Sequence, residues 1–151
     1  MSECGQWSFP EENNEAVSTY WPSLALLFHV KMKISCTATI ISPTTLLTAY
    51  SCLQPANFNP LEWVVFAGSR GDMPMMDEAT QIKIVKDIVN HPQTKQHQHL
   101  VAQDITLVTL YEPLQLNSNV KAACLSDSTP KQRLACYEVG WAVTSIGKND
   151  N

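Results

Sequence analysis

Short apolar runs separated by turn-forming residues dominate the chain from residue 24 onward. Their length and their content of Ile, Val, Leu, Thr and Phe are typical of β-strands. Stretches with Gly, Pro, Asn and Ser separate the runs, and no amphipathic helical period interrupts them. The pattern therefore predicts an all-β sandwich or barrel. The expected strands cover residues 24–30, 35–41, 45–48, 63–67, 81–89 and 104–110.

The start of the chain has a different character. Residues 4–19 are polar and acidic, contain Pro10, and show neither helical nor alternating periodicity. Residues 1–5 have neither the basic nor the hydrophobic region of a secretory signal peptide, so any export signal is expected upstream or already removed. The sequence therefore predicts a leader or linker at residues 1–19, followed by one domain at residues 20–151.

Charge and hydropathy exclude two classes of partner. The 151 residues carry a formal net charge of -4, and the ten Lys and Arg residues are scattered along the chain. Such a chain offers no basic stripe for a phosphate backbone, so no nucleic-acid partner is expected. No apolar run approaches the roughly 20 residues of a membrane helix, so no membrane span is predicted.

The cysteine pattern favours disulfides over a metal site. None of the five cysteines forms a C-x-x-C pair, which removes the usual spacing of zinc ribbons and thioredoxin-like motifs. Four cysteines in two disulfides would indicate an oxidising compartment and would leave one without a partner in this sequence.

Seven sequence landmarks occur in the order found in trypsin-like serine proteases. The most specific is L-L-T-A-Y-S-C at residues 46–52, which is similar to the family motif V-L-T-A-A-H-C. The sequence Q-D-I-T-L-V-T-L at residues 103–110 resembles N-D-I-A-L-I-K-L. The other landmarks are W-P-S-L-A-L-L at 21–27, C-T-A-T-I-I-S-P at 36–43, N-H-P at 90–92, C-L at 124–125 and C-Y-E-V-G-W at 136–141.

This resemblance implies a trypsin-like fold of two antiparallel barrels, with the first complete and only the opening strands of the second present. It also implies a Cys36–Cys52 disulfide within the first barrel and a Cys4–Cys124 disulfide that tethers the leader. Cys136 would stay unpaired, because its usual partner in the family lies in the second half of the domain.

The resemblance also shows where the chemistry departs from the family. The catalytic histidine falls on Ser51, whereas Asp104 keeps the family's aspartate. A serine hydroxyl cannot act as the general base near neutral pH, as imidazole does. The nucleophile motif G-D-S-G-G-P does not occur in the sequence, and no Arg or Lys precedes the segment where zymogen cleavage is expected. We therefore expect no catalytic residue here, and we expect Asp104 to be a core carboxylate that accepts hydrogen bonds from backbone donors.

Four further features have a structural and a functional interpretation, and we favour the structural one in each case. Arg70, Gly71 and Asp72 form an R-G-D tripeptide in a turn-rich stretch, where an adhesion loop is possible but an ordinary turn is expected. Asp72, Asp77 and Glu78 are expected to form a solvated acidic loop, not a calcium site. His91, His97 and His99 are expected to lie in a polar surface loop, not to bind metal. Tyr50 is expected to pack into part of the space of the lost imidazole. No metal and no cofactor are predicted.

Together these features predict a secreted, non-catalytic protease homologue that acts in binding, scaffolding or regulation of proteolysis. Its expected partners are an unidentified protein and the missing second barrel or flanking modules. Two alternatives stay open at this point: a fragment of a divergent serine endopeptidase, and a truncated gene product without a function of its own.

Overall fold

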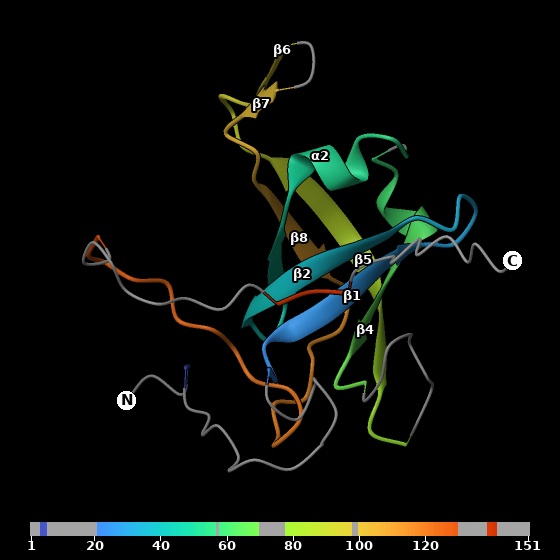
Figure 1. Ribbon diagram of the computed structural model, residues 1–151. Helices are drawn as coiled ribbons and strands as arrows, with labels where there is room; N and C mark the ends of the chain where they lie inside the picture. The colour runs from blue at the N-terminus through green and yellow to red at the C-terminus, as the bar shows by residue number, and fades with distance from the viewer. Residues whose placement is uncertain are drawn as a thin grey trace, which may run out of the picture.

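Six antiparallel strands close into a barrel in the computed structural model of the chain (Figure 1). The structure describes residues 4–5, 21–56, 58–69, 78–97, 100–129 and 139–141. The order around the barrel is β1-β2-β3-β8-β5-β4. These strands are β1 (Leu24–His29), β2 (Ser35–Ser42), β3 (Thr45–Thr48), β4 (Trp63–Ala67), β5 (Gln81–Asn90) and β8 (Thr106–Leu110).

The remaining elements are short and lie outside the barrel. A single α-helical turn, α2 (Tyr50–Leu53), follows β3, and a 3-10 turn, η1 (Pro60–Glu62), precedes β4. The strands β6 (Lys95–His97) and β7 (Leu100–Ala102) form a separate hairpin that projects from one end of the barrel (Figure 1). Within the described residues, no helix has the length and apolar character needed to cross a membrane.

The predicted all-β fold is confirmed, and each of the six predicted strands corresponds to a strand of the barrel. Four strand ends differ from the prediction by one or two residues, and two of these differences have visible reasons. The first strand ends at His29, because the backbone turns there. The Lys33 amide donates a hydrogen bond back to the His29 carbonyl, and Lys33 itself has a φ of 58°. The last begins at Thr106, because Gln103 has a φ of 55°, which breaks the extended conformation before it.

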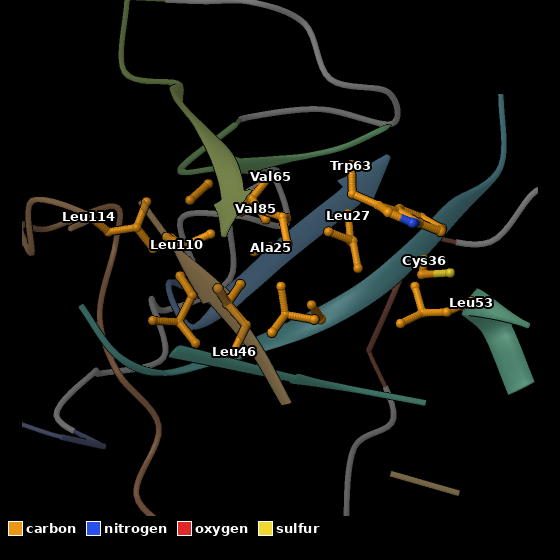
Figure 2. Packing of buried hydrophobic residues seen from close by; sticks show 14 of the residues in the cluster. Ala25, Leu27, Cys36, Leu46, Leu53, Trp63, Val65, Val85, Leu110 and Leu114 are labelled. Atoms are coloured by element: carbon orange, nitrogen blue, oxygen red, sulfur yellow. The ribbon is translucent and has the colours of Figure 1, made fainter. Parts of the chain in front are cut away.

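Alternate residues of the strands fill the barrel (Figure 2). Ala25 and Leu27 of β1 point inward, and Val65 of β4 and Val85 of β5 meet them in the same core. Leu53 of α2 also belongs to this core and is fully buried, so the single helical turn is anchored by its last residue. Successive side chains of a strand point to opposite faces, so burial of the inner face accounts for the alternating apolar residues in the sequence of the strands.

One buried polar cluster fixes the turn after β1. The His29 ring is fully buried and lies edge-on against Trp63, with the ring centroids 4.9 Å apart. Its Nδ1 accepts a hydrogen bond from the Met32 amide at 3.1 Å. Its Nε2 lies 3.2 Å from Glu62 Oε2, close enough for an ion pair but not aligned as a hydrogen bond. The Lys31 ammonium lies 2.6 Å from the other oxygen of the same carboxylate. Glu62 therefore contacts both His29, at the end of β1, and Lys31, in the turn that follows.

Two disulfides tie distant parts of the chain together. Cys36 of β2 pairs with Cys52 of α2, across a sequence separation of 16 residues. Cys4 pairs with Cys124 across 120 residues. The Gly5 amide also donates to the Ala122 carbonyl at 2.9 Å, so the described N-terminal residues run alongside residues 122–124. These are the two pairings that the family resemblance implies.

Truncation of a core side chain should destabilise the barrel strongly. Leu27→Ala removes a fully buried side chain, and such substitutions cost about 2–5 kcal/mol of unfolding free energy. Urea denaturation followed by tryptophan fluorescence measures the loss. Ile82→Ala is the matched control, because Ile82 is exposed on the barrel surface and its truncation should change stability by less than about 1 kcal/mol. Equal effects of the two substitutions would contradict the inside-outside assignment of the strands.

Removal of the Cys36–Cys52 disulfide should also lower the stability of the barrel. The chain-entropy model gives about 3 kcal/mol for closing a loop of this length. The double variant Cys36→Ala, Cys52→Ala should therefore unfold at lower urea concentration than the parent, with the Cys4–Cys124 bond still present in non-reducing peptide maps. If the double variant and the parent unfolded at the same urea concentration, the bridge would have no stabilising role.

Candidate functional site

Barrel topology brings Ser51 and Asp104 to the same end of the molecule. The strands β3 and β8 are antiparallel neighbours, and Thr48 lies opposite Thr106. Ser51 follows Thr48 by three residues, and Asp104 precedes Thr106 by two residues. Because one strand leaves the barrel where the other enters, the segments beyond this pair must meet. Figure 1 shows α2 at this end of the barrel.

The Asp104 carboxylate binds Ser51 through both of its oxygens. Oδ1 accepts the Ser51 backbone amide at 2.7 Å. Oδ2 accepts the Ser51 hydroxyl, Oγ, at 2.7 Å. Both residues are exposed to solvent. The two residues that the sequence resemblance aligns with the family's histidine and aspartate are thus in direct contact.

Asp104 acts here as a cap for a helix that has none of its own. The residue before α2 is Ala49, whose side chain makes no capping hydrogen bond. The first backbone amides of a helix have no partner within the helix, and a carboxylate that accepts one of them stabilises that end. Asp104 supplies this acceptor from 53 residues away in the sequence. The prediction that it satisfies a backbone donor agrees with the structure, but the prediction of a core position is wrong, because the carboxylate is exposed.

The neighbouring Tyr50 packs against a residue that the sequence did not single out. Its ring stacks on Phe58 with the centroids 5.4 Å apart and an angle of 20° between the planes. Phe58 is partly buried against the barrel core. No local sequence signal links the two residues, which lie on either side of the loop after α2, so this contact could be found only from the fold.

The chemistry of this pair is limited by the absence of a base. A carboxylate accepts a hydrogen bond from an alkyl hydroxyl and orients it, but it is too weak a base to remove the proton. A serine hydroxyl is likewise no proton acceptor for another nucleophile near neutral pH. The arrangement holds Ser51 and the start of α2 in place.

The other candidate sites divide between described and undescribed residues. His91 holds its own turn, because its Nδ1 accepts the Gln93 amide at 3.1 Å. Glu78 is exposed before β5. In the described part of the chain, no group of three His, Cys, Asp or Glu residues is arranged to hold a metal ion. Six candidate residues lie outside the described residues: Arg70, Gly71 and Asp72 of the tripeptide, Asp77, His99 and Cys136. His97 belongs to β6.

Comparison with known proteins identifies the family. A protein-family model described as Trypsin matches residues 12–150. The chain belongs to the trypsin family. It is 30% identical over 132 residues to chymotrypsin-C of Bos taurus, and the match covers 84% of this chain and 47% of that protein. It is 28% identical over 152 residues to chymotrypsin-C of Mus musculus, covering 93% of this chain and 54% of that protein.

A third relative matches a shorter stretch. Transmembrane protease serine 11C of Mus musculus is 35% identical over 96 residues, which covers 64% of this chain and 20% of that protein. The chain spans about half the length of the chymotrypsin-C relatives. The match to the Trypsin family model accounts for the closed barrel and for the order of the sequence landmarks around Ser51 and Asp104.

Loss of the Asp104 carboxylate should loosen α2 without unfolding the barrel. Asp104→Ala removes both bonds to Ser51, and loss of a helix cap costs about 0.5–2 kcal/mol. The exposed position favours the lower part of that range. Hydrogen exchange of the Ser51 amide should speed up in the variant, while amides of β1 should keep their protection.

Ser51→Ala is the matched control for this experiment. It removes the hydroxyl contact but keeps the backbone amide that Asp104 accepts, so its effect on exchange at α2 should be smaller than that of Asp104→Ala. If both variants left the exchange rate of the residue 51 amide unchanged, Asp104 would not be the cap.

Proposed function

We propose that this trypsin-family domain acts by binding and not by peptide-bond cleavage. The observation that carries the proposal is the bidentate contact of Ser51 with Asp104, at the positions where the family motif has histidine and aspartate. In the family mechanism, the histidine takes the proton of the nucleophile and the aspartate orients the histidine. Here the orienting group is retained and is used to hold a serine and a helix end.

The proposed setting is extracellular. The two disulfides support it, because such bonds persist in oxidising compartments and are rare in the cytosol. The proposed role is regulation or scaffolding of proteolysis through contacts with a protein partner. The retained barrel supports this role, since the fold keeps its core and its surface strands while the base is replaced.

The proposal predicts that the natural secreted form lacks serine-hydrolase activity. The expected result is no labelling by a fluorophosphonate probe and no turnover of a broad peptide library between pH 6 and 9, a range in which an imidazole base would act. Bovine chymotrypsin-C, assayed in parallel, is the positive control. Labelling that heat denaturation abolishes, or turnover that a serine-protease inhibitor blocks, would assign the chain to the active endopeptidases.

A second test concerns the site itself. The imidazole introduced by Ser51→His should lie beside the Asp104 carboxylate, and an adjacent negative charge favours the protonated ring. Its pKa, followed by NMR through the ring C–H shifts, should therefore be higher than the pKa of the same imidazole in the Ser51→His, Asp104→Asn double variant. Equal pKa values in the two backgrounds would show that Asp104 no longer faces position 51.

A further inference from the structure

One histidine closes the turn between β1 and β2. The His29 carbonyl accepts the Lys33 amide at 3.0 Å, and the His29 amide donates to the Ile34 carbonyl at 2.9 Å. The ring adds a third contact, because its Nδ1 accepts the Met32 amide at 3.1 Å. The backbone and the side chain of one residue therefore hold the turn of residues 30–33.

The ring contact fixes the protonation state of the imidazole in the closed turn. A nitrogen that accepts a hydrogen bond carries no proton, so the neutral ring has its proton on Nε2. The imidazolium ion has a proton on both nitrogens. With that second proton on Nδ1, two N–H groups would face each other and the Met32 amide would lose its acceptor. The closed turn therefore requires His29 to be unprotonated at Nδ1.

Glu62 allows the ring to take up a proton inside the barrel. A charge in a fully buried position is costly unless an opposite charge lies beside it. The Oε2 atom of Glu62 lies 3.2 Å from Nε2 of His29, and the Glu62 side chain is only 13% exposed. The protonated ring can thus stay in the core, so the change that protonation causes falls on the turn and not on β1.

The same proton weakens a second contact of the turn. Lys31 Nζ lies 2.6 Å from Oε1 of Glu62, so the ammonium and the ring share one carboxylate. With a neutral ring, the charges of Lys31 and Glu62 balance. A positive ring places a second cation on that carboxylate, and the Lys31 side chain, which is 71% exposed, can move into water. Both side-chain contacts of the turn therefore weaken together when His29 is protonated.

Other charged groups lie around this cluster but do not contact the ring. Lys33 is exposed in the turn itself, and Lys86 and Asp87 are exposed on β5, the strand that packs on η1. The strands β2 and β4 flank β1 and contribute no titratable side chain. Among the described residues, Glu62 is the one charged group at ion-pair distance from the His29 ring.

We propose that the turn of residues 30–33 is a pH-dependent switch, closed when His29 is neutral and open when its ring is protonated. The open turn binds one proton more than the closed turn, so a fall in pH favours the open form. Imidazole is the side chain that changes charge between about pH 5 and 8. The turn carries Val30 and Met32, which are 39% and 51% exposed, so the surface at this point of the molecule would differ between neutral and acidic conditions.

This inference does not depend on the proposed loss of catalysis. None of the groups that close the turn takes part in the contact between Ser51 and Asp104. The switch is tested without a substrate or a partner, and the hydrolase assay tests the other proposal independently.

NMR titration of the intact chain between about pH 8 and pH 5 tests the switch. The ring C–H shifts of His29 and the amide shifts of Met32 and Lys33 should change with one midpoint. The hydrogen-exchange protection of the Met32 amide, expressed relative to its intrinsic rate at each pH, should fall roughly tenfold or more below that midpoint. The Leu27 amide in β1 should keep its protection over the whole range.

Two variants and a matched control assign the effect. Glu62→Gln keeps the shape of the side chain but removes its charge, so the midpoint should move to lower pH. His29→Asn keeps an acceptor for the Met32 amide but cannot titrate, so its turn should stay closed throughout. Glu112→Gln makes the same change in the exposed pair with Lys83 and should leave the midpoint unaltered. Urea denaturation of each variant shows whether the barrel is intact.

His91 supplies a reference within the same molecule. Its Nδ1 also accepts a turn amide, that of Gln93 at 3.1 Å, and its carbonyl accepts the Thr94 amide at 2.9 Å. Unlike His29, it is only half-buried, and no carboxylate of the described residues forms an ion pair with it. The His91 titration should therefore be the same in the parent and in Glu62→Gln.

Four results would overturn the inference. The first is a His29 ring that titrates while the Met32 amide keeps its protection. The second is a ring that stays neutral down to pH 5. The third is a common loss of protection at Met32 and Leu27, which would be acid unfolding of the barrel and not a switch in one turn. The fourth is an equal midpoint in Glu62→Gln and the parent.

Discussion

Closure of the barrel is the constraint on which the rest of this structure depends. Every one of the six strands has two neighbours, so the register of each strand is set from both sides. A slip of one residue would move all its inward side chains to the outside. The irregularity in β5 shows how strict this requirement is. Val85 and Ile88 are three positions apart, so a regular strand would point them to opposite faces, yet both pack on the core. The bulge between Val85 and Asp87 adds one residue to β5, and this brings Ile88 back to the inner face.

The sequence predicted the barrel strands well and the small elements poorly, for the same physical reason. Strands such as Trp63–Ala67 bury alternate side chains, and burial leaves a pattern in the sequence. The hairpin of Lys95–His97 and Leu100–Ala102 is a sheet separate from the barrel, and its first strand is polar, so the sequence predicted a polar loop at its histidines. The helix Tyr50–Leu53 is a single turn, too short to display a helical period.

The candidate site was predictable in part. The resemblance to trypsin-like proteases pairs Ser51 with Asp104 from the sequence alone, because it assigns them the positions of two residues that act together in that family. A backbone donor for Asp104 was predicted, but not that this donor is the amide of Ser51 itself. A serine hydroxyl is one bond from the β-carbon, so the carboxylate that reaches it is also within reach of the residue's own amide. The side-chain replacement and the helix cap are therefore one arrangement, and neither residue carries a local signal of it.

The Cys4–Cys124 bond makes most of this chain a closed ring. The backbone between these residues and the bond itself form one covalent loop, which spans 120 residues of separation. A single cut anywhere in that loop opens the ring but separates nothing. A protease that nicks the chain there would leave its mass unchanged, apart from the water added, until the disulfide is reduced. Processing of this protein within the ring would therefore be invisible to size measurements under non-reducing conditions, and its N-terminal residues would stay attached to the barrel.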